Sequence, residues 1–163
     1  MVLERDPAYT HASTPLSVGG IRQQFSLKEN IHMSLYGARF VKQLQEEEGE
    51  RLSFKENGYL FLAAPQGEAT LGENHAVQRR EGVSWIDLLS PAELAQHFPW
   101  LRTDDLALAS LGRENEGWMD PWLFLEALKR WVEGGRGGGR EDSLERENEG
   151  WMDPWLFLQA LKM

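Results

Sequence analysis

The sequence predicts a mixed α/β fold in which amphipathic helices alternate with short apolar strands. Three observations support this class. Apolar side chains repeat every three or four residues over 31–44, short apolar runs lie between turn residues, and hydrophobic (41%) and charged (26%) contents are near the globular average. The length of 163 residues suits one ordinary domain.

The first long helix is predicted from a single apolar stripe, formed by Ile31, Leu35, Ala38, Val41 and Leu44. Asn30 is its expected cap, and Gly49 after an acidic run ends it. A further helix is expected over 68–81.

Two helix starts carry specific capping signals. Ser90, Pro91 and Glu93 match a capping box with proline in the first turn, for a helix that ends near Pro99. Asp120 before a proline predicts the cap of a helix that runs to about residue 132.

Strands are predicted at 59–63, 83–89 and 106–111, where apolar runs are bounded by turn residues. Residues 1–3 resemble the end of a buried strand. We expect that strand to end before Pro7, because proline cannot donate a hydrogen bond to the neighbouring strand.

A 20-residue segment occurs twice, at 110–129 and 143–162, with differences only at Gly112/Glu145 and Glu126/Gln159. The offset of 33 residues matches a helical-repeat period. Functional arrays normally contain at least three diverged units, so a recent duplication or a gene-model error is the simpler interpretation. The glycine-rich stretch 134–140 between the copies predicts a flexible linker.

Charge and composition exclude several function classes. The net charge of −9 argues against nucleic acid as the main partner. The chain has no cysteine, its four histidines show no metal-ligand spacing, and no Gly-x-Ser-x-Gly motif is present. We therefore predict no metal site, and no apolar run is long enough for a transmembrane segment.

One constellation near the N-terminus suits a dinucleotide. It comprises Glu4, Ser13, Thr14, Gly19, Gly20, Ile21 and Arg22. In dinucleotide-binding folds, an acidic residue at a strand end accepts hydrogen bonds from ribose hydroxyls, and Glu4 occupies such a position. The loop that follows can bring hydroxyls and backbone N–H groups near phosphates. A plain acidic strand end followed by an ordinary loop remains the alternative.

Several stretches together resemble one family. They are VLERDPAYTHASTPLSVGGIRQQFSLKENIHMSL, NGYLFLA, LLSPAELAQHFPWL, LALASLG and EGWMDPW. In this order they resemble the D-amino-acid-oxidase-like FAD-dependent oxidoreductases over residues 1 to about 130, and most of all the members linked to assembly of mitochondrial complex I. The resemblance implies FAD as cofactor, oxidation of amines at flavin N5, a Rossmann-like FAD domain and a second domain of antiparallel sheet with helices.

The resemblance also implies residue roles. Glu4 would bind the ribose, Ser13 and Thr14 the pyrophosphate region, and the run from Gly19 to Arg22 (Gly20 and Ile21 between them) the flavin region. It divides the chain into a partial FAD-binding segment (1–29), a fragment of both domains (30–133), a linker (134–142) and a duplicated helical segment (143–163). It identifies no catalytic residue.

The sequence lacks the Gly-x-Gly-x-x-Gly turn that places pyrophosphate on a helix N-terminus in these folds. We therefore expect a form truncated at both ends that binds FAD weakly or not at all and is inactive alone. The resemblance implies a mitochondrial location, although the chain carries no targeting segment, and complex I assembly intermediates as partners. The alternative is a non-enzymatic interaction protein that docks a partner through its tryptophan-rich helices.

Overall fold

A computed structural model describes residues 5–134, and the chain divides into two compact units, Met1–Leu125 and Glu126–Met163. The sheets and the candidate site lie in the first unit. The predicted strand end at 1–3, Glu4 and the second copy at 143–162 lie outside the described residues.

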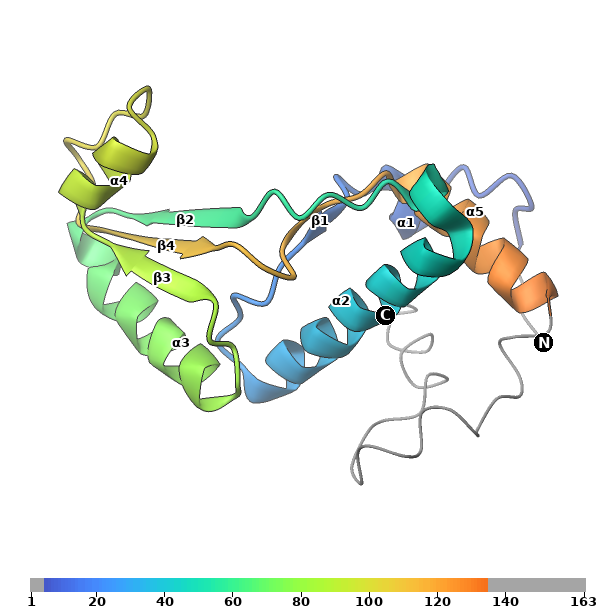
Figure 1. The fold of residues 1–163 in the computed structure, drawn as a ribbon, viewed down its shortest axis with the longest axis horizontal. Helices are drawn as coiled ribbons and strands as arrows, with labels where there is room; N and C mark the ends of the chain where they lie inside the picture. Colours follow the sequence, from blue (N-terminus) through green and yellow to red (C-terminus); the bar gives the residue numbers. More distant parts are fainter. Residues whose placement is uncertain (1–4, 135–163) are drawn as a thin grey trace. The chain divides into compact units, whose positions relative to one another are not determined.

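The main sheet is antiparallel throughout, with the strand order β2-β4-β3 (Figure 1). Its strands are β2 (Tyr59–Ala63), β4 (Leu108–Gly112) and β3 (Ile86–Leu89). In the register, Tyr59 pairs with Gly112 and Phe61 with Ser110. Because side chains alternate along a strand, these four residues share one face of the sheet.

A second, smaller sheet brings distant segments together. Strand β1 (Gly20–Ile21) pairs with β5 (Gly117–Trp118). On its other side, Trp118 forms a bridge with Lys55, whose N–H donates to the Trp118 oxygen at 2.7 Å. The loop after α1 is thereby tied to the segments that flank the main sheet.

The helices are α1 (Ser13–Leu16), α2 (Lys28–Glu48), α3 (Glu68–Arg80), α4 (Pro91–His97) and α5 (Pro121–Glu133), with 3-10 turns at Gly49–Leu52 and Pro65–Gly67. The mixed fold class is therefore confirmed. The apolar stripe of α2 is confirmed as well, because four of its five residues are buried and Leu35 packs against the core. None of the helices between residues 5 and 134 combines the length and the apolar content that a membrane span requires.

The predicted cap at Asn30 is wrong. Helix α2 begins at Lys28, since the N–H of Ile31 already donates to the carbonyl of Leu27 at 3.0 Å. No side chain caps this end. Tertiary packing of the buried Ile31 replaces the local signal.

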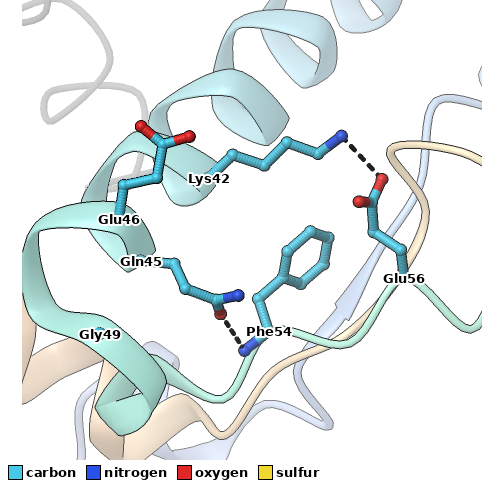
Figure 2. A pocket seen from close by; sticks show the side chains of 6 residues that line it. All are labelled: Lys42, Gln45, Glu46, Gly49, Phe54 and Glu56. Carbon is cyan, nitrogen blue, oxygen red and sulfur yellow. Dashed lines mark hydrogen bonds and ion pairs between the residues drawn. The ribbon is translucent and has the colours of Figure 1, made fainter.

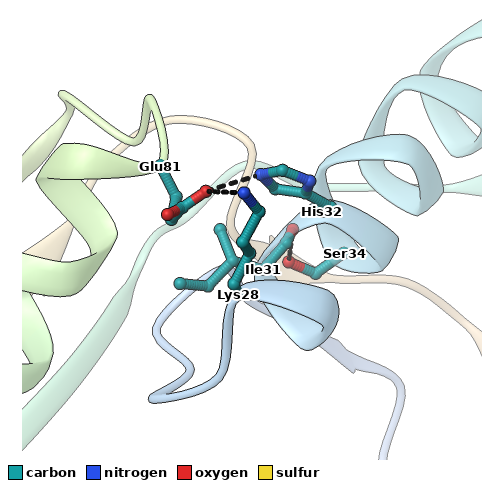
Figure 3. Close-up of polar contacts among 5 residues, drawn as sticks. All are labelled: Lys28, Ile31, His32, Ser34 and Glu81. Atoms are coloured by element: carbon teal, nitrogen blue, oxygen red, sulfur yellow. Dashed lines mark hydrogen bonds and ion pairs between the residues drawn. The ribbon is translucent and has the colours of Figure 1, made fainter. Parts of the chain in front are cut away.

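Two polar contacts tie the start of α2 to the turn after α3 (Figure 3). Glu81 Oε2 lies 2.9 Å from His32 Nε2 and 3.7 Å from Lys28 Nζ. Both basic side chains are largely exposed, so this link adds little to stability.

Hydrophobic clusters cover both faces of the sheet. Ile31, Val83 and Ile86 join α2 to β3, whereas Leu94 and Leu111 are among the residues that join α4 to β3 and β4. The core therefore fixes the frame on which the polar site below is built.

The remaining local predictions are largely confirmed. Ser90 and Glu93 form the capping box, and Asp120 Oδ1 accepts hydrogen bonds from the N–H groups of Trp122 and Leu123. Strand β3 is shorter than the predicted 83–89, because the N–H of Val83 closes the end of α3 on the Gln78 carbonyl. Strand β4 spans residues 108–112 instead of 106–111.

Candidate functional site

The loop predicted to contact a dinucleotide begins with helix α1. Ser13 and Thr14 form its first two residues, and within the described part of the chain their hydroxyls have no hydrogen-bond partner. Ser17 is differently placed, because its hydroxyl accepts the N–H of Gly19 at 3.2 Å. Two hydroxyl groups thus remain available at the start of this loop.

Gly19 is required by the packing of the chain itself. Its φ of +72° lies in the left-handed region, and a Cβ there would overlap the carbonyl oxygen of Met119. That residue in turn donates its N–H to the Gly19 oxygen at 3.0 Å. Gly20 is more open, since the nearest atom to a Cβ there would be Tyr59 Cε2 at 3.4 Å. Gly20 and Ile21 form β1, which places the next residue beside the main sheet.

Arg22 is held by aromatic rings. Its guanidinium carbon lies 4.8 Å from the ring centre of Phe25, 5.0 Å from that of Phe61 and 5.7 Å from that of Tyr59. Each such contact is worth about 0.5–1 kcal/mol where exposed and more where desolvated. Within residues 5–134, Arg22 forms no ion pair. The structure therefore offers a fixed, half-buried cation.

A buried carboxylate, which sequence reasoning missed, lies beside this cation. Glu116 is fully buried, and its Oε1 accepts the N–H of Gln23 at 2.6 Å. Its Oε2 accepts Gln24 Nε2 at 2.8 Å, and Gln24 Oε1 accepts the hydroxyl of Ser110 at 2.6 Å. Burial raises the pKa of Glu116 above its ordinary value, against these hydrogen bonds and the charge of Arg22, which lower it.

One neighbouring glycine leaves space for this carboxylate, and another allows a close backbone approach. A Cβ at Gly112 would overlap Glu116 Oε2 and lie 2.5 Å from its Cδ. A Cβ at Gly117 would overlap the Lys55 oxygen. Gly112 and Gly117 on either side of Glu116, next to an apolar strand, are the sequence pattern that could have indicated a buried carboxylate here.

The predicted site residues that the structure describes lie on α1, on β1 and directly beside β1. The structure brings Gly19, Gly20, Ile21 and Arg22 together with the ends of the main sheet, and it places Ser13 and Thr14 on α1. Glu4 lies outside the described residues. The donor chemistry fits FAD, because free hydroxyls and a guanidinium are suitable partners for phosphates and for the acceptor atoms of a flavin.

A separate pocket lies at the C-terminal end of α2 (Figure 2). It is lined by Lys42, Gln45, Glu46, Gly49, Phe54 and Glu56. Lys42 Nζ lies 2.7 Å from Glu56 Oε1, and Gln45 Oε1 accepts the N–H of Phe54 at 2.6 Å. Burial pushes the pKa of Glu56 up, but hydrogen bonds from Lys42 and Asn115 hold it below its ordinary value. Since its lysine and Glu56 already bind each other, we place the candidate site on the loop.

No metal centre accompanies the loop in the described residues. Between residues 5 and 134, no group of three or more histidine, aspartate and glutamate side chains is arranged to hold a metal ion.

Comparison with known sequences identifies relatives. A family model described as FAD dependent oxidoreductase (DAO) matches residues 1–140. FAD-dependent oxidoreductase domain-containing protein 1 of Xenopus laevis is 48% identical over 136 residues, which cover 80% of this chain and 27% of the relative. The Bos taurus protein of the same name is 47% identical (80% and 28% covered), and the Drosophila melanogaster homolog is 39% identical (82% and 26%). The chain thus spans about a quarter of the length of these relatives.

Solved structures show the same fold. L-proline dehydrogenase from P. horikoshii has a TM-score of 0.67 and 30% identity, with 76% of this chain and 32% of that chain covered. Glycine oxidase from Geobacillus kaustophilus has a TM-score of 0.59 and 21% identity, with 72% of this chain and 33% of that chain covered. At this identity the match shows only that the two proteins share a fold.

These matches confirm the family resemblance, and they do not favour the alternative of a non-enzymatic interaction protein. Because the family model matches residues 1–140 and the relatives are 39–48% identical over some four-fifths of the sequence, the chain belongs to the DAO family of FAD-dependent oxidoreductases.

Proposed function

We propose that this chain carries the FAD-contacting loop of an amine-oxidising flavoprotein. The proposal rests on the placement of Arg22. This half-buried cation is held by three aromatic rings at the end of the loop that starts with Ser13 and Thr14. The similarity to L-proline dehydrogenase, whose named substrate is a secondary amine, supports the reaction class.

Each residue of the loop has a role in this proposal. Glu4 binds the ribose, while the hydroxyls of Ser13 and Thr14 donate to the pyrophosphate. The open backbone at Gly20, together with Ile21, allows close approach, and Gly19 holds the turn in place. Arg22 offers its guanidinium to the flavin region. FAD, when bound, supplies the two-electron oxidation of the amine.

We further propose that the 163-residue chain alone holds FAD weakly. Glu4 contributes one or two hydrogen bonds, each worth about 0.5–1.5 kcal/mol, or up to about 3 with its charge. Binding costs about 4–15 kcal/mol in lost freedom of the ligand and ordering of the loop. The net charge of −9 does not attract an anionic cofactor. The sequence contains no Gly-x-Gly-x-x-Gly turn to bind the pyrophosphate. We expect a dissociation constant no better than roughly the high micromolar range, and little or no activity of this chain alone.

Titration of FAD into the purified chain, followed by flavin fluorescence, tests the affinity. We expect weak quenching that Glu4→Ala and Arg22→Ala reduce further. Glu73→Ala, which removes an exposed carboxylate from α3, is the matched control and leaves the curve unchanged. Saturable quenching at sub-micromolar FAD that is lost in Glu4→Ala would contradict weak binding.

We also propose a mitochondrial location and a role in assembly of respiratory complex I. The support is the sequence resemblance given above to family members linked to that process. Fractionation of cells that express the tagged chain tests the location. Affinity capture from mitochondria, with an unrelated tagged matrix protein as control, tests the partners. Selective recovery of complex I assembly intermediates supports the role, and equal recovery with the control contradicts it.

A further inference from the structure

Glu116 connects the peptide that follows Arg22 to the main sheet. It accepts hydrogen bonds from the backbone of Gln23 and from the side chain of Gln24, the two residues directly after Arg22. Gln24 Nε2 also donates to the Tyr59 oxygen on β2, at 3.0 Å. The carboxylate therefore fixes the chain direction at the residue that carries the guanidinium.

A weaker, longer-range link between the two side chains is electrostatic. Glu116 is fully buried, which raises its pKa, and the charge of Arg22 acts to lower that pKa, although the two side chains do not lie within ion-pair distance of each other. Attraction between charges is stronger where water is excluded than in bulk solvent. The rings of Phe25, Tyr59 and Phe61 hold the guanidinium of Arg22, while Glu116 holds the chain directly after it through Gln23 and Gln24.

We infer that Glu116 is a positioning residue that holds Arg22 in the orientation needed at the FAD-contacting loop. The relevance of Arg22 to the cofactor rests on the proposed function, whereas the link between Glu116 and Arg22 rests on the hydrogen bonds that Glu116 accepts from the two residues after Arg22.

Glutamate is the residue type that this position requires. Two acceptor oxygens face two N–H donors, so glutamine, with one acceptor oxygen and an amide group, leaves one donor unmatched. Aspartate keeps both oxygens and the charge but is one methylene shorter. Gly112 leaves the space that the longer side chain occupies.

Nuclear magnetic resonance of the arginine side chains tests the inference on the full chain without cofactor. In the wild type we expect a ring-shifted Nε–Hε signal for Arg22, because its guanidinium lies close to three aromatic rings. The signal is assigned by its absence in Arg22→Lys. Glu116→Gln is expected to lose that ring-shifted signal, and Glu116→Asp to shift it part of the way. Glu56→Gln, which breaks a more exposed ion pair with Lys42, is the control and leaves the signal in place.

The amide spectrum of each variant reports whether it is folded, and Glu116→Asp serves as the readout if Glu116→Gln does not fold. An unchanged Arg22 signal in a folded Glu116 variant would overturn the inference and leave Glu116 a purely structural role. Addition of FAD to the wild type separates the two proposals. If Arg22 responds to the Glu116 variants but not to FAD, the positioning stands and the proposed flavin contact fails.

Discussion

Alanine at position 112 places a methyl group in the space that the Glu116 carboxylate occupies. The new Cβ would overlap Oε2 and lie 2.5 Å from Cδ and 3.1 Å from Gln24 Nε2. Gly112 is buried at the end of β4 and its φ is not in the left-handed region, so the backbone itself tolerates alanine. The cost of Gly112→Ala therefore comes from displacement of the carboxylate.

The size of this cost follows from the contacts of Glu116. If the carboxylate moves, it loses hydrogen bonds from Gln23 and Gln24. Hydrogen bonds to charged groups contribute about 1.5–3 kcal/mol each, so the loss is about 3–6 kcal/mol. Alanine also lowers the conformational entropy of the unfolded chain, which stabilises the folded state by about 0.4–1 kcal/mol. We expect Gly112→Ala to lower the free energy of unfolding by roughly 2–5 kcal/mol, or Tm by about 5–20 °C.

Thermal and urea unfolding of a double-mutant cycle measure this effect. In the Glu116→Ala background there is no carboxylate to displace, so Gly112→Ala is expected to cost less than about 1 kcal/mol, a clear non-additivity. Gly72→Ala is the control, because Gly72 lies in α3 with open space around it, and helix propensity predicts stabilisation by about 0.5–1 kcal/mol. Equal losses for Gly112→Ala in both backgrounds would show that displacement of the Glu116 carboxylate is not the cause of the cost.

Three further predictions concern the frame of the site. Leu35→Asp puts a charge against the cluster between α2 and β3 and is expected to lower the free energy of unfolding by roughly 2–3 kcal/mol. The control Gln43→Asp, at an exposed position of the same helix, is expected to change it little. Equal Tm values for Leu35→Asp and the wild type would contradict this. Hydrogen bonds from Ser90 hold the pKa of Glu93 below its ordinary 4.5, so this contribution to stability is present above pH 4.5 and is lost as pH falls through the lower folded value. A carboxyl carbon titration is expected to show the pKa of Glu93 rise in Ser90→Ala, and an unchanged value would count against the capping box. Glu81→Gln removes only contacts to exposed basic side chains and is expected to cost less than about 1 kcal/mol in urea unfolding; a larger loss would show that the link between α2 and α3 is underestimated.

Local signals explain which parts of the fold were predictable. The stripe on α2, the capping box at Ser90 and the cap at Asp120 follow from spacing and side-chain chemistry within a few residues. The predicted cap at Asn30 is wrong because the buried Ile31 is already part of the helix, whose first hydrogen bond runs to Leu27. Tertiary packing overrides a local capping preference in such a case.

The candidate site was predictable only in part. Hydroxyls, glycines and Arg22 lie within one short loop, so their chemistry is visible in sequence. Glu116 reaches Gln23 across 93 positions, and no periodicity connects residues so far apart. Gly112 is one of the two positions at which the 20-residue copies differ, and the structure shows why a side chain is not accommodated there beside Glu116.

The proposed function depends on contact between FAD and the loop from Ser13 to Arg22. Titration of FAD into the isotopically labelled chain, followed residue by residue by nuclear magnetic resonance, tests it at the weak affinity expected. We expect shifts that saturate at roughly high-micromolar FAD and that concentrate on Ser13, Thr14, Gly20 and Arg22, with none at the exposed end of α4. Shifts confined to other surfaces, or none at millimolar FAD, would contradict it.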